Sequence, residues 1–184
     1  MNKSVFGFSL IELMVGISIT GVLMAFAVPS FTYMLKQNRA MGMTNELVAS
    51  LNLARSEAVR RNQQVTVCIS DVTASNTSCS TSLGWQNGWV AFLDLGTLGV
   101  YDSTKDTKLK VGQPSYLNVV ITADSIFNKF VSFNAMGIAQ GTSGQQSGGN
   151  LYVCSGGVSG QTVGVQRTIN INTIGRISIR NGTC

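Results

Sequence analysis

The sequence predicts an α+β fold in which a long N-terminal helix precedes a β-rich domain. Two observations predict it. An apolar and then amphipathic stretch with helical signals runs from Phe8 to about Gln63, and β-branched runs separated by glycine- and serine-rich segments follow from Gln64 onward. The chain has 184 residues, which is enough for one ordinary domain plus an extra element.

The composition favours an exported protein. Asp, Glu, Lys and Arg make up 11% of the chain, whereas about 25% is usual in soluble domains. The net charge is +5, from 13 Lys and Arg against 8 Asp and Glu. A polar but weakly charged surface suits a secreted or periplasmic β-rich domain, and the mild basic excess permits contact with nucleic acid or anionic surfaces without requiring it.

The first predicted element is a membrane-type helix at Phe8–Val28. It has the roughly 20 apolar residues that a helix needs to cross a hydrocarbon core, and Glu12 is its single charge. Lys3 precedes it and predicts a cytoplasmic N-terminus, so the rest of the chain would be exported. A plain signal anchor is one competing interpretation, and a cleaved secretory signal with an A-x-A site at Ala25–Ala27 is another.

Glu12 argues against both competing interpretations. A carboxylate within an apolar helix costs a few kcal/mol in lipid unless it has a partner, which makes it a candidate functional residue. A natural partner would be the positive charge of a new N-terminus, created by cleavage after Gly7. The sequence therefore suggests a processed helix that pairs its carboxylate with an amine.

A second helical stretch is predicted at residues 29–63. Pro29 is expected to kink or locally melt the helix, and no other proline occurs in this range. Apolar residues recur at intervals of three or four, at Leu47, Leu51, Ala54 and Ala58. This stripe predicts packing against a sheet, while the charged residues between them, Arg55 included, are expected on the wet faces.

Residues 64–184 form the predicted β domain. Alternating or β-branched runs predict six strands, at Val65–Ser70, Gly88–Leu93, Leu117–Thr122, Lys129–Asn134, Gln166–Ile171 and Arg176–Arg180. The last two flank Asn172–Gly175 and predict a terminal hairpin. Polar segments predict surface loops at Asp71–Gly84, Leu95–Gln113 and Ala139–Asn150.

The four cysteines all follow the apolar segment, and none belongs to a CxxC pair. Zinc sites usually bring their ligands in close pairs, so two disulfides in an oxidising compartment are favoured over a zinc site. Three connectivities exist, and we favour Cys68–Cys79 and Cys154–Cys184 because each pair brackets one local segment. The second pair would fix the chain terminus to the domain.

The residues around the suggested cleavage point resemble a known processing signal. The run GFSLIE at Gly7–Glu12, with a short basic leader before it and Pro29 after the apolar span, is similar to the type III signal of type IV pilins and type II secretion pseudopilins. The resemblance implies that a prepilin peptidase removes residues 1–7, cutting between Gly7 and Phe8, and methylates Phe8. It also implies that Glu12 pairs with the amine of a neighbouring subunit during assembly.

Three further stretches resemble the GspH/FimT/FimU group of minor pilins and pseudopilins. They are Leu51–Cys68, the aromatic run Trp85–Phe92 and the closing Gly175-Arg176. The resemblance covers nearly the whole chain and implies a long helix packed on a domain of two antiparallel sheets. It also implies a single pass through the bacterial inner membrane with the C-terminal domain in the periplasm, and later a place in a pilus or pseudopilus.

The main hypothesis is a minor type IV pilin, a structural subunit that primes or joins the pilus near its tip after processing. Its expected partners are other minor and major pilins or pseudopilins, the prepilin peptidase and the inner membrane. The first alternative is a GspH-type minor pseudopilin of a type II secretion system. The others are a FimT-like DNA-binding pilin for natural transformation and an exported enzyme with a cleaved signal.

The DNA alternative depends on basic residues near the C-terminus. Members of the FimT branch bind DNA through Gly-Arg-x-Arg, but here Ser178 stands in place of the second arginine after Gly175 and Arg176. In a strand, Arg176, Ser178 and Arg180 point to one face. Arg176 and Arg180, with Arg167 on the paired strand, are the candidates for phosphate contacts, and a solvated hairpin face is the alternative.

The sequence offers little for catalysis. It contains no histidine, which excludes Ser-His and Cys-His pairs, and it has no phosphate-binding glycine loop. We therefore expect no enzyme activity, no catalytic residues, no cofactor and no metal. Trp85 and Trp89 are expected to pack in the core and at a strand edge, with a ligand platform as the less favoured interpretation.

Overall fold

The computed structural model describes residues 9–72, 78–115, 118–155 and 165–183. These residues form one long helix, α1 (Leu10–Arg61), one short 3-10 helix, η1 (Trp85–Asn87), and nine strands. The strands are β1 (Val65–Ile69), β2 (Trp89–Leu93), β3 (Thr107–Gly112), β4 (Val119–Ala123), β5 (Phe130–Phe133), β6 (Ala139–Gln140), β7 (Gly149–Ser155), β8 (Val165–Ile171) and β9 (Ile177–Thr183). The chain divides into two compact units, Met1–Leu35 and Lys36–Cys184.

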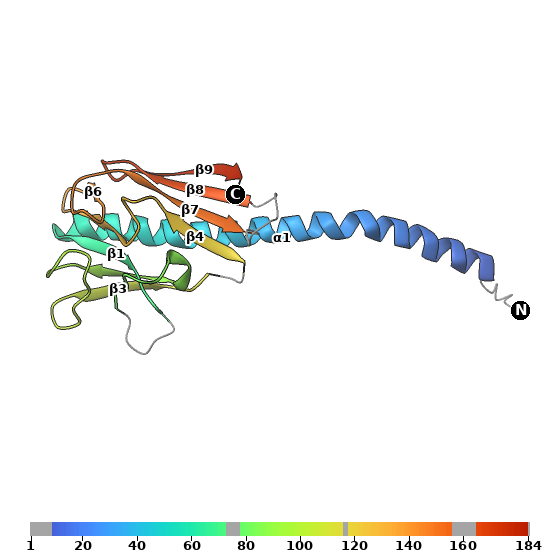
Figure 1. Cartoon of the computed structure of the whole chain (residues 1–184), viewed down its shortest axis with the longest axis horizontal. Coiled ribbons are helices and arrows are strands. Elements are labelled where there is room, and N and C mark those ends of the chain that lie inside the picture. Colours follow the sequence, from blue (N-terminus) through green and yellow to red (C-terminus); the bar gives the residue numbers. More distant parts are fainter. Residues whose placement is uncertain (1–8, 73–77, 116–117, 156–164, 184) are drawn as a thin grey trace, which may run out of the picture. The chain divides into compact units, whose positions relative to one another are not determined.

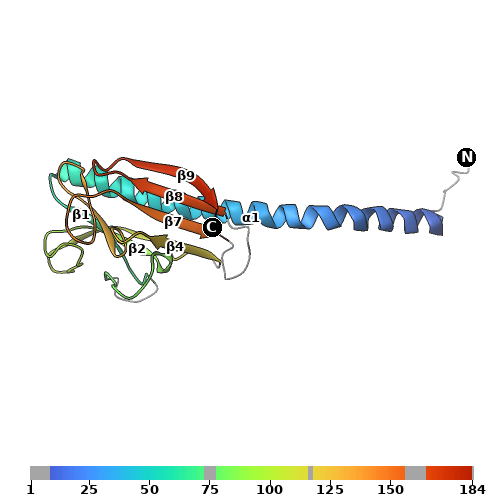
Figure 2. The ribbon, with the colours of Figure 1, turned by 45° about the horizontal axis from the view of Figure 1, so that its top comes forward.

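The strands of the second unit form two antiparallel sheets, which confirms the predicted fold class. The first sheet has the order β3-β2-β1-β5-β6, and the second has the order β4-β7-β8-β9. The C-terminal part of α1 runs along both sheets (Figures 1 and 2), and its buried side chains share one core with residues of both. The predicted terminal hairpin is present as β8 and β9.

The core confirms the apolar stripe of the helix. Leu47, Leu51, Ala54 and Ala58 are fully buried. They share one cluster with the inward-facing residues of both sheets, and Met43 extends the stripe by a turn. Burial of one leucine side chain contributes about 1.5–3 kcal/mol, so this contact holds the helix on the sheets. The buried hydroxyls of Thr44 and Ser50 donate to carbonyls four residues earlier and are therefore satisfied.

Both tryptophans belong to this core, as predicted. Trp85 and Trp89 are buried almost completely. The indole N–H of Trp85 donates to the carbonyl of Phe127 at 2.9 Å, which satisfies a polar group that burial would otherwise leave unpaired. The ring of Trp89 lies so close to Gly112 that a Cβ there would be 2.0 Å from it.

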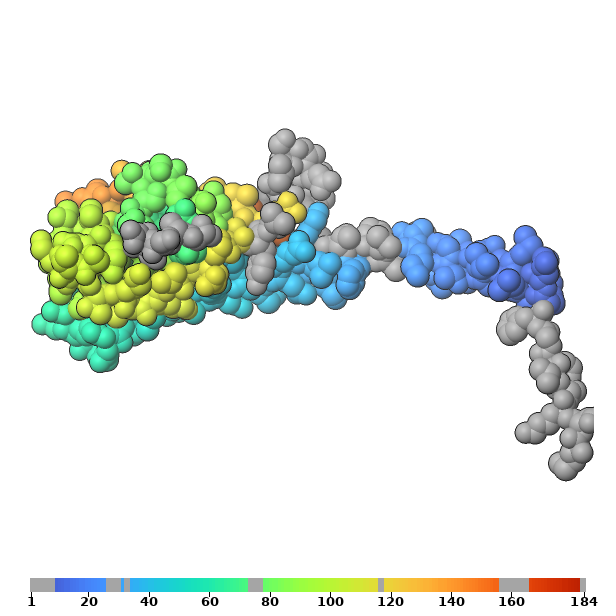
Figure 3. Space-filling view, turned by 90° about the horizontal axis from the view of Figure 1, so that it is seen from below, coloured from blue at the N-terminus to red at the C-terminus, as the bar shows by residue number. Residues whose placement is uncertain are grey.

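The outer face of the first sheet is buried as well, against the expectation for its loops. The segment between β2 and β3 folds over a small second core of Cys68, Val90, Phe92 and Phe130. The rings of Phe92 and Tyr101 meet edge to face with centroids 5.2 Å apart. Figure 3 shows the surface that the first sheet and its loops form, in green to yellow, beside the cyan C-terminal part of α1.

Two buried carboxylates hold the segment between β2 and β3 in place through hydrogen bonds. Asp94 Oδ2 accepts from the Thr66 hydroxyl at 2.7 Å and from the Gly99 N–H at 2.9 Å. Asp106 accepts from the N–H groups of Leu95 and Asp102 at 2.9 and 2.8 Å. Burial raises the pKa of the Asp94 carboxyl above its usual range, although these hydrogen bonds oppose the shift.

Three strands were missed by the sequence prediction. β3 lies within the predicted loop Leu95–Gln113 and β6 within the predicted loop Ala139–Asn150, while β7 begins in that loop. β3 is an edge strand, where lysines are tolerated and discourage pairing with other chains, so its polar composition concealed it. β7 alternates between buried and half-buried residues but is flanked by glycines.

Pro29 was expected either to kink the helix or to melt it locally, and the structure contradicts the second alternative. α1 is continuous from Leu10 to Arg61, so the expected local melting does not occur. A proline removes one backbone donor and crowds one carbonyl, and a long helix retains its other hydrogen bonds around such a position.

Candidate assembly site

The part of α1 that belongs to the first unit is apolar on all sides. Every large apolar residue between Leu10 and Met24 is more than half exposed. A helix of this kind has no polar face to turn toward water and is stable only in lipid or against other apolar helices. The first unit by itself does not supply such a covering over these residues.

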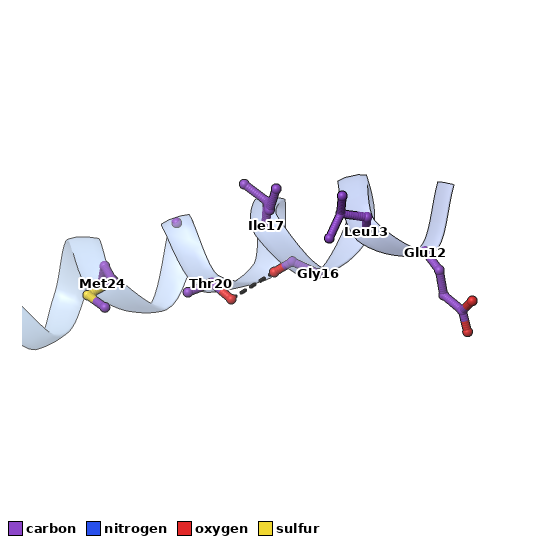
Figure 4. A pocket seen from close by; sticks show the side chains of 7 residues that line it. Glu12, Leu13, Gly16, Ile17, Thr20 and Met24 are labelled. Carbon is purple, nitrogen blue, oxygen red and sulfur yellow. Dashed lines mark hydrogen bonds between the residues drawn. The ribbon is translucent and has the colours of Figure 1, made fainter. Parts of the chain in front are cut away.

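The polar side chains of this helix are arranged to suit an apolar environment. The hydroxyls of Ser18 and Thr20 donate to the carbonyls of Met14 and Gly16, at 2.8 and 2.7 Å. The second of these bonds is drawn in Figure 4. Because each hydroxyl is bonded within its own helix, neither leaves an unpaired donor when water is removed.

Glu12 lies in the first turn of α1 beside the helix N-cap. The carbonyl of Ser9 accepts from the N–H groups of Glu12 and Leu13, at 3.1 and 3.2 Å. The Ser9 N–H in turn donates weakly to Glu12 Oε2 at 3.4 Å, which is one half of a capping box. The carboxylate otherwise extends away from the helix and is exposed (Figure 4), so it is free to meet a cation.

A shallow groove runs along the helix from Glu12 to Met24. Gly16 and Gly21 supply no side chain to fill it, and a Cβ at either position would have open space around it. Leu13 and Ile17 project together from the same side of the helix in Figure 4. Small residues let a second helix approach closely, so the groove suits helix packing with Glu12 at one end.

The predicted cleavage point between Gly7 and Phe8 lies outside the described residues. Within the part of the chain that the structure describes, no helix has both the length and the hydropathy required to cross a membrane. Processing at this point and the single membrane pass of Phe8–Val28 therefore stay proposals.

One of the two predicted disulfides is present. Cys68 in β1 is bonded to Cys79, with their Cα atoms 5.5 Å apart. Cys154 lies in β7, but its predicted partner Cys184 lies outside the described residues, so that pairing stays a prediction. None of the cysteines that the structure describes is a free thiol, and the described residues contain no cluster of three or more His, Cys, Asp or Glu that could hold a metal ion.

The structure does not bring the three candidate arginines to one face. Arg167 pairs with the buried Val153 of the neighbouring strand, and directly paired residues project to the same side, so Arg167 faces the core side of the sheet. Arg180 pairs with Thr168, one position along β8, and therefore projects to the opposite side. Arg176 and Arg180 are both exposed, whereas Arg167 is half-buried.

Arg55 is a structural residue that the sequence prediction placed on a wet face. It is half-buried, and its Nε donates to the Gly137 carbonyl at 3.2 Å while its Nη2 donates to the Ile174 carbonyl at 3.0 Å. One helix residue thus holds two hairpin turns. The sequence does contain a sign of this role: Arg55 is four residues after Leu51 and therefore borders the apolar stripe of the helix.

A helix that is apolar all round in one part and buried against two antiparallel sheets in another defines a pilin-type subunit. The family model described as "Type II transport protein GspH" matches residues 43–175 of this chain. The model described as "Prokaryotic N-terminal methylation motif" matches residues 2–28. The chain therefore belongs to the GspH family.

Two crystal forms of the type IV minor pilin FimU from Pseudomonas aeruginosa (strain PAO1) are similar in structure. The first has a TM-score of 0.57 and 18% sequence identity, over 78% of this chain and 90% of that chain. The second has a TM-score of 0.48 and 16% identity, over 78% and 91%. At 18% identity the first likeness shows the shared pilin fold alone. No curated protein sequence matches the chain.

Family membership confirms the class that the sequence indicated. The chain is a pilin-type structural subunit with an N-terminal methylation motif. The family implies processing by a peptidase, anchoring to a membrane and assembly with other pilins. The particular assembly that this chain joins, and the subunits that it contacts there, are proposals.

Proposed function

We propose that this chain is a minor type IV pilin. It is cleaved between Gly7 and Phe8, is methylated at Phe8 and is held in the bacterial inner membrane by Phe8–Val28, with its sheets in the periplasm. It then enters the filament near its tip. The observation that carries this proposal is the apolar surface on all sides of α1 between Leu10 and Met24, in which Glu12 is the single charge.

This surface is suited to two environments in turn. In the bilayer it is solvated by lipid, and in the filament by the apolar helices of other subunits. The hydroxyls bonded within the helix and the open groove at Gly16 and Gly21 are compatible with both. Transfer from lipid to helix bundle therefore requires no rearrangement within this helix.

Glu12 gives the packing a register. An unpaired carboxylate in an apolar interior is costly, whereas a partner cation at hydrogen-bond distance offsets much of that cost. The amine of a neighbouring methylated Phe8 would supply the cation. Because Glu12 is the one charge on this surface, a helix that slips by a turn loses the pair and regains nothing elsewhere.

A minor pseudopilin of a type II secretion system is the alternative within the same class. The matched family is itself described as a type II transport protein, while the fold is similar to that of a minor pilin. Both assemblies use the same processed helix. Deletion of the gene would distinguish them, because loss of surface pili supports the first and loss of secreted proteins the second.

The DNA-binding alternative depends on Arg176 and Arg180, since Arg167 projects to the other face of the sheet. Two exposed arginines on a hairpin provide few phosphate contacts, and such contacts are non-specific and weaken with salt. The assembly role needs no residue of this hairpin to bind nucleic acid.

The N-terminus of the mature chain tests the proposal. Mass spectrometry of the full-length protein isolated from its own cells should find a chain that begins with methylated Phe8. Gly7→Val should leave the leader attached because a branched side chain replaces the small residue at the cleavage point, whereas Gly16→Ala should be processed normally. A mature chain that begins at Val28, or one that retains Met1, would contradict the pilin assignment.

A further inference from the structure

Two hairpin turns of the second unit share one design. Asn134–Gly137 joins β5 to β6, and Asn172–Gly175 joins β8 to β9. In each turn the amide oxygen of the asparagine accepts a backbone N–H further along, and the closing glycine has a positive φ, +74° and +77°. Turns of this type usually carry polar residues at their tips, but here the third positions are Met136 and Ile174.

These two side chains are exposed to an unusual degree. Met136 is 71% exposed and Ile174 is 64% exposed, more than any other large apolar residue described in the second unit. Val59, near the end of α1, is 53% exposed and lies beside the first turn, since a Cβ on Gly137 would be 3.1 Å from its Cγ2. We call Val59, Met136 and Ile174 the turn patch.

The turn patch is fixed in place by the residues beneath it. Arg55 bonds the carbonyls of Gly137 and Ile174, and the Ala139 N–H donates to the Thr173 carbonyl at 2.9 Å. The end of α1 and the turn between β8 and β9 lie at the same end of the second unit (Figure 1). Because the three segments are already joined, covering the patch would cost little conformational entropy, as in a preformed protein interface.

The rim of the turn patch is basic. Arg60 and Arg61 share the single carboxylate of Glu57. Arg176 follows the second turn and is exposed. Arg60 and Arg61 come directly after Val59 in the chain and Arg176 directly after Gly175, so three guanidinium groups adjoin the segments of the patch against the one carboxylate of Glu57. Two copies of this surface would therefore repel each other, and an acidic surface would complement it.

We propose that the turn patch is a docking surface for another, different pilin-type subunit whose contacting face is apolar with an acidic rim. This inference rests on the proposed assembly function, because it takes the partner from the same filament. Exposed apolar side chains on a preformed platform with a charged rim are the usual composition of a protein interface. The apolar centre supplies affinity, and the arginines select the partner by charge.

Photo-cross-linking tests the docking surface directly. In cells that contain their own filament subunits, benzoylphenylalanine replaces Met136 in one full-length variant and Val100, an exposed apolar residue outside the turn patch, in a control. We expect position 136 to form an adduct with a second protein that carries an N-terminal methylation motif, and position 100 to form none. Adducts with lipid alone, with proteins that lack the motif, or with nothing overturn the proposal.

A second arm removes the apolar contact. With the cross-linker at Val59, the double variant Met136→Ser and Ile174→Ser should lower the adduct yield by roughly tenfold or more, because burial of one such side chain corresponds to more than about a factor of ten in an equilibrium constant. Leu95→Ser with Val100→Ser is the matched control and should leave the yield unchanged. An unchanged yield from the first pair overturns the proposal.

Two further measurements keep the outcome clear. Thermal unfolding of the purified variants should be unchanged, since the replaced side chains are exposed, and Met136→Gln replaces the serine variant if unfolding shifts. The adducts are read in the membrane fraction before assembly. A chain that is never recovered in filaments therefore contradicts the proposed function without deciding the docking surface, and a missing adduct contradicts the docking surface alone.

Discussion

Gly175 is the residue at which three segments of the fold meet. A Cβ on it would lie 2.0 Å from the Gly137 carbonyl oxygen and 2.9 Å from Arg55 Nε, and its φ is +77°. The sequence presented Gly175 and Arg176 as a pair that resembles a family motif. In the structure, the absence of a side chain at Gly175 lets the second turn approach the first turn next to Arg55.

Gly175→Ala should therefore destabilise the second unit by about 3 kcal/mol, from the left-handed backbone and from displacement of the turns. Urea unfolding of the full chain in detergent would measure the loss. Gly144→Ala is the matched control, because its φ is +75° but the nearest atom, Leu98 Cδ2, is 3.2 Å from the added Cβ. Equal losses in the two variants would show that the close approach contributes nothing.

At the scale of the element, ion pairs between charged side chains stabilise the last turn of α1. Glu57 accepts from Arg60 at 2.6 Å and from the adjacent Arg61 at 2.5 Å. The two arginines also lie where the helix dipole favours positive charge. Hydrogen bonds from Arg60 and then from Arg61 lower the pKa of the Glu57 carboxyl to about 2, from an ordinary 4.5.

This shift predicts an acid dependence with a definite sign. Because the folded pKa of Glu57 lies below the unfolded value, the stabilisation is complete above about pH 4.5 and is lost as the pH falls toward about 2. Glu57→Gln should remove that part of the pH dependence of the free energy of unfolding. Urea unfolding at a series of pH values across this window measures it.

Asp94→Asn is the contrasting variant. Burial raises the pKa of Asp94 above 3.8 in the folded state, so its contribution favours folding at low pH and is lost as the pH rises through the folded pKa. Its replacement should change the pH profile in the opposite direction. Changes in the same direction for the two variants would contradict one of the two assignments.

At the scale of the whole molecule, Glu12 connects the processing of the chain to its assembly. Its carboxylate is exposed at the start of a helix that otherwise shows apolar residues. Within the first unit it accepts a weak hydrogen bond from the Ser9 N–H at 3.4 Å. We therefore expect the carboxylate to act between subunits.

Glu12→Gln should lower the amount of this subunit in sheared filaments by about tenfold or more, because a neutral amide loses a charge-assisted bond worth roughly 1.5–3 kcal/mol. Immunoblots of filament and membrane fractions give the ratio. Asp102→Asn, which neutralises a carboxylate of the second unit, is the control and should incorporate normally. If Glu12→Gln keeps the wild-type ratio, the carboxylate does not guide assembly.

Much of the fold of this protein could be predicted from its amino-acid sequence alone. The class of fold, the buried stripe from Leu47 to Ala58, the terminal hairpin and the Cys68–Cys79 disulfide depend on local periodicity or on a short loop, and each is present. The exposed apolar helix follows from composition. These features were visible because near neighbours in the sequence determine them.

The sheet edges and the turn patch were decided by tertiary structure. β3 has lysines that a central strand would exclude, and only its place at an edge explains them. Arg55 and Ile174 are separated by 119 positions, so no periodicity connects them. Arg167 and Arg180 are likewise separated by the register of β8 on β9. Contacts between distant segments depend on how the whole chain packs, and a single sequence does not record that packing.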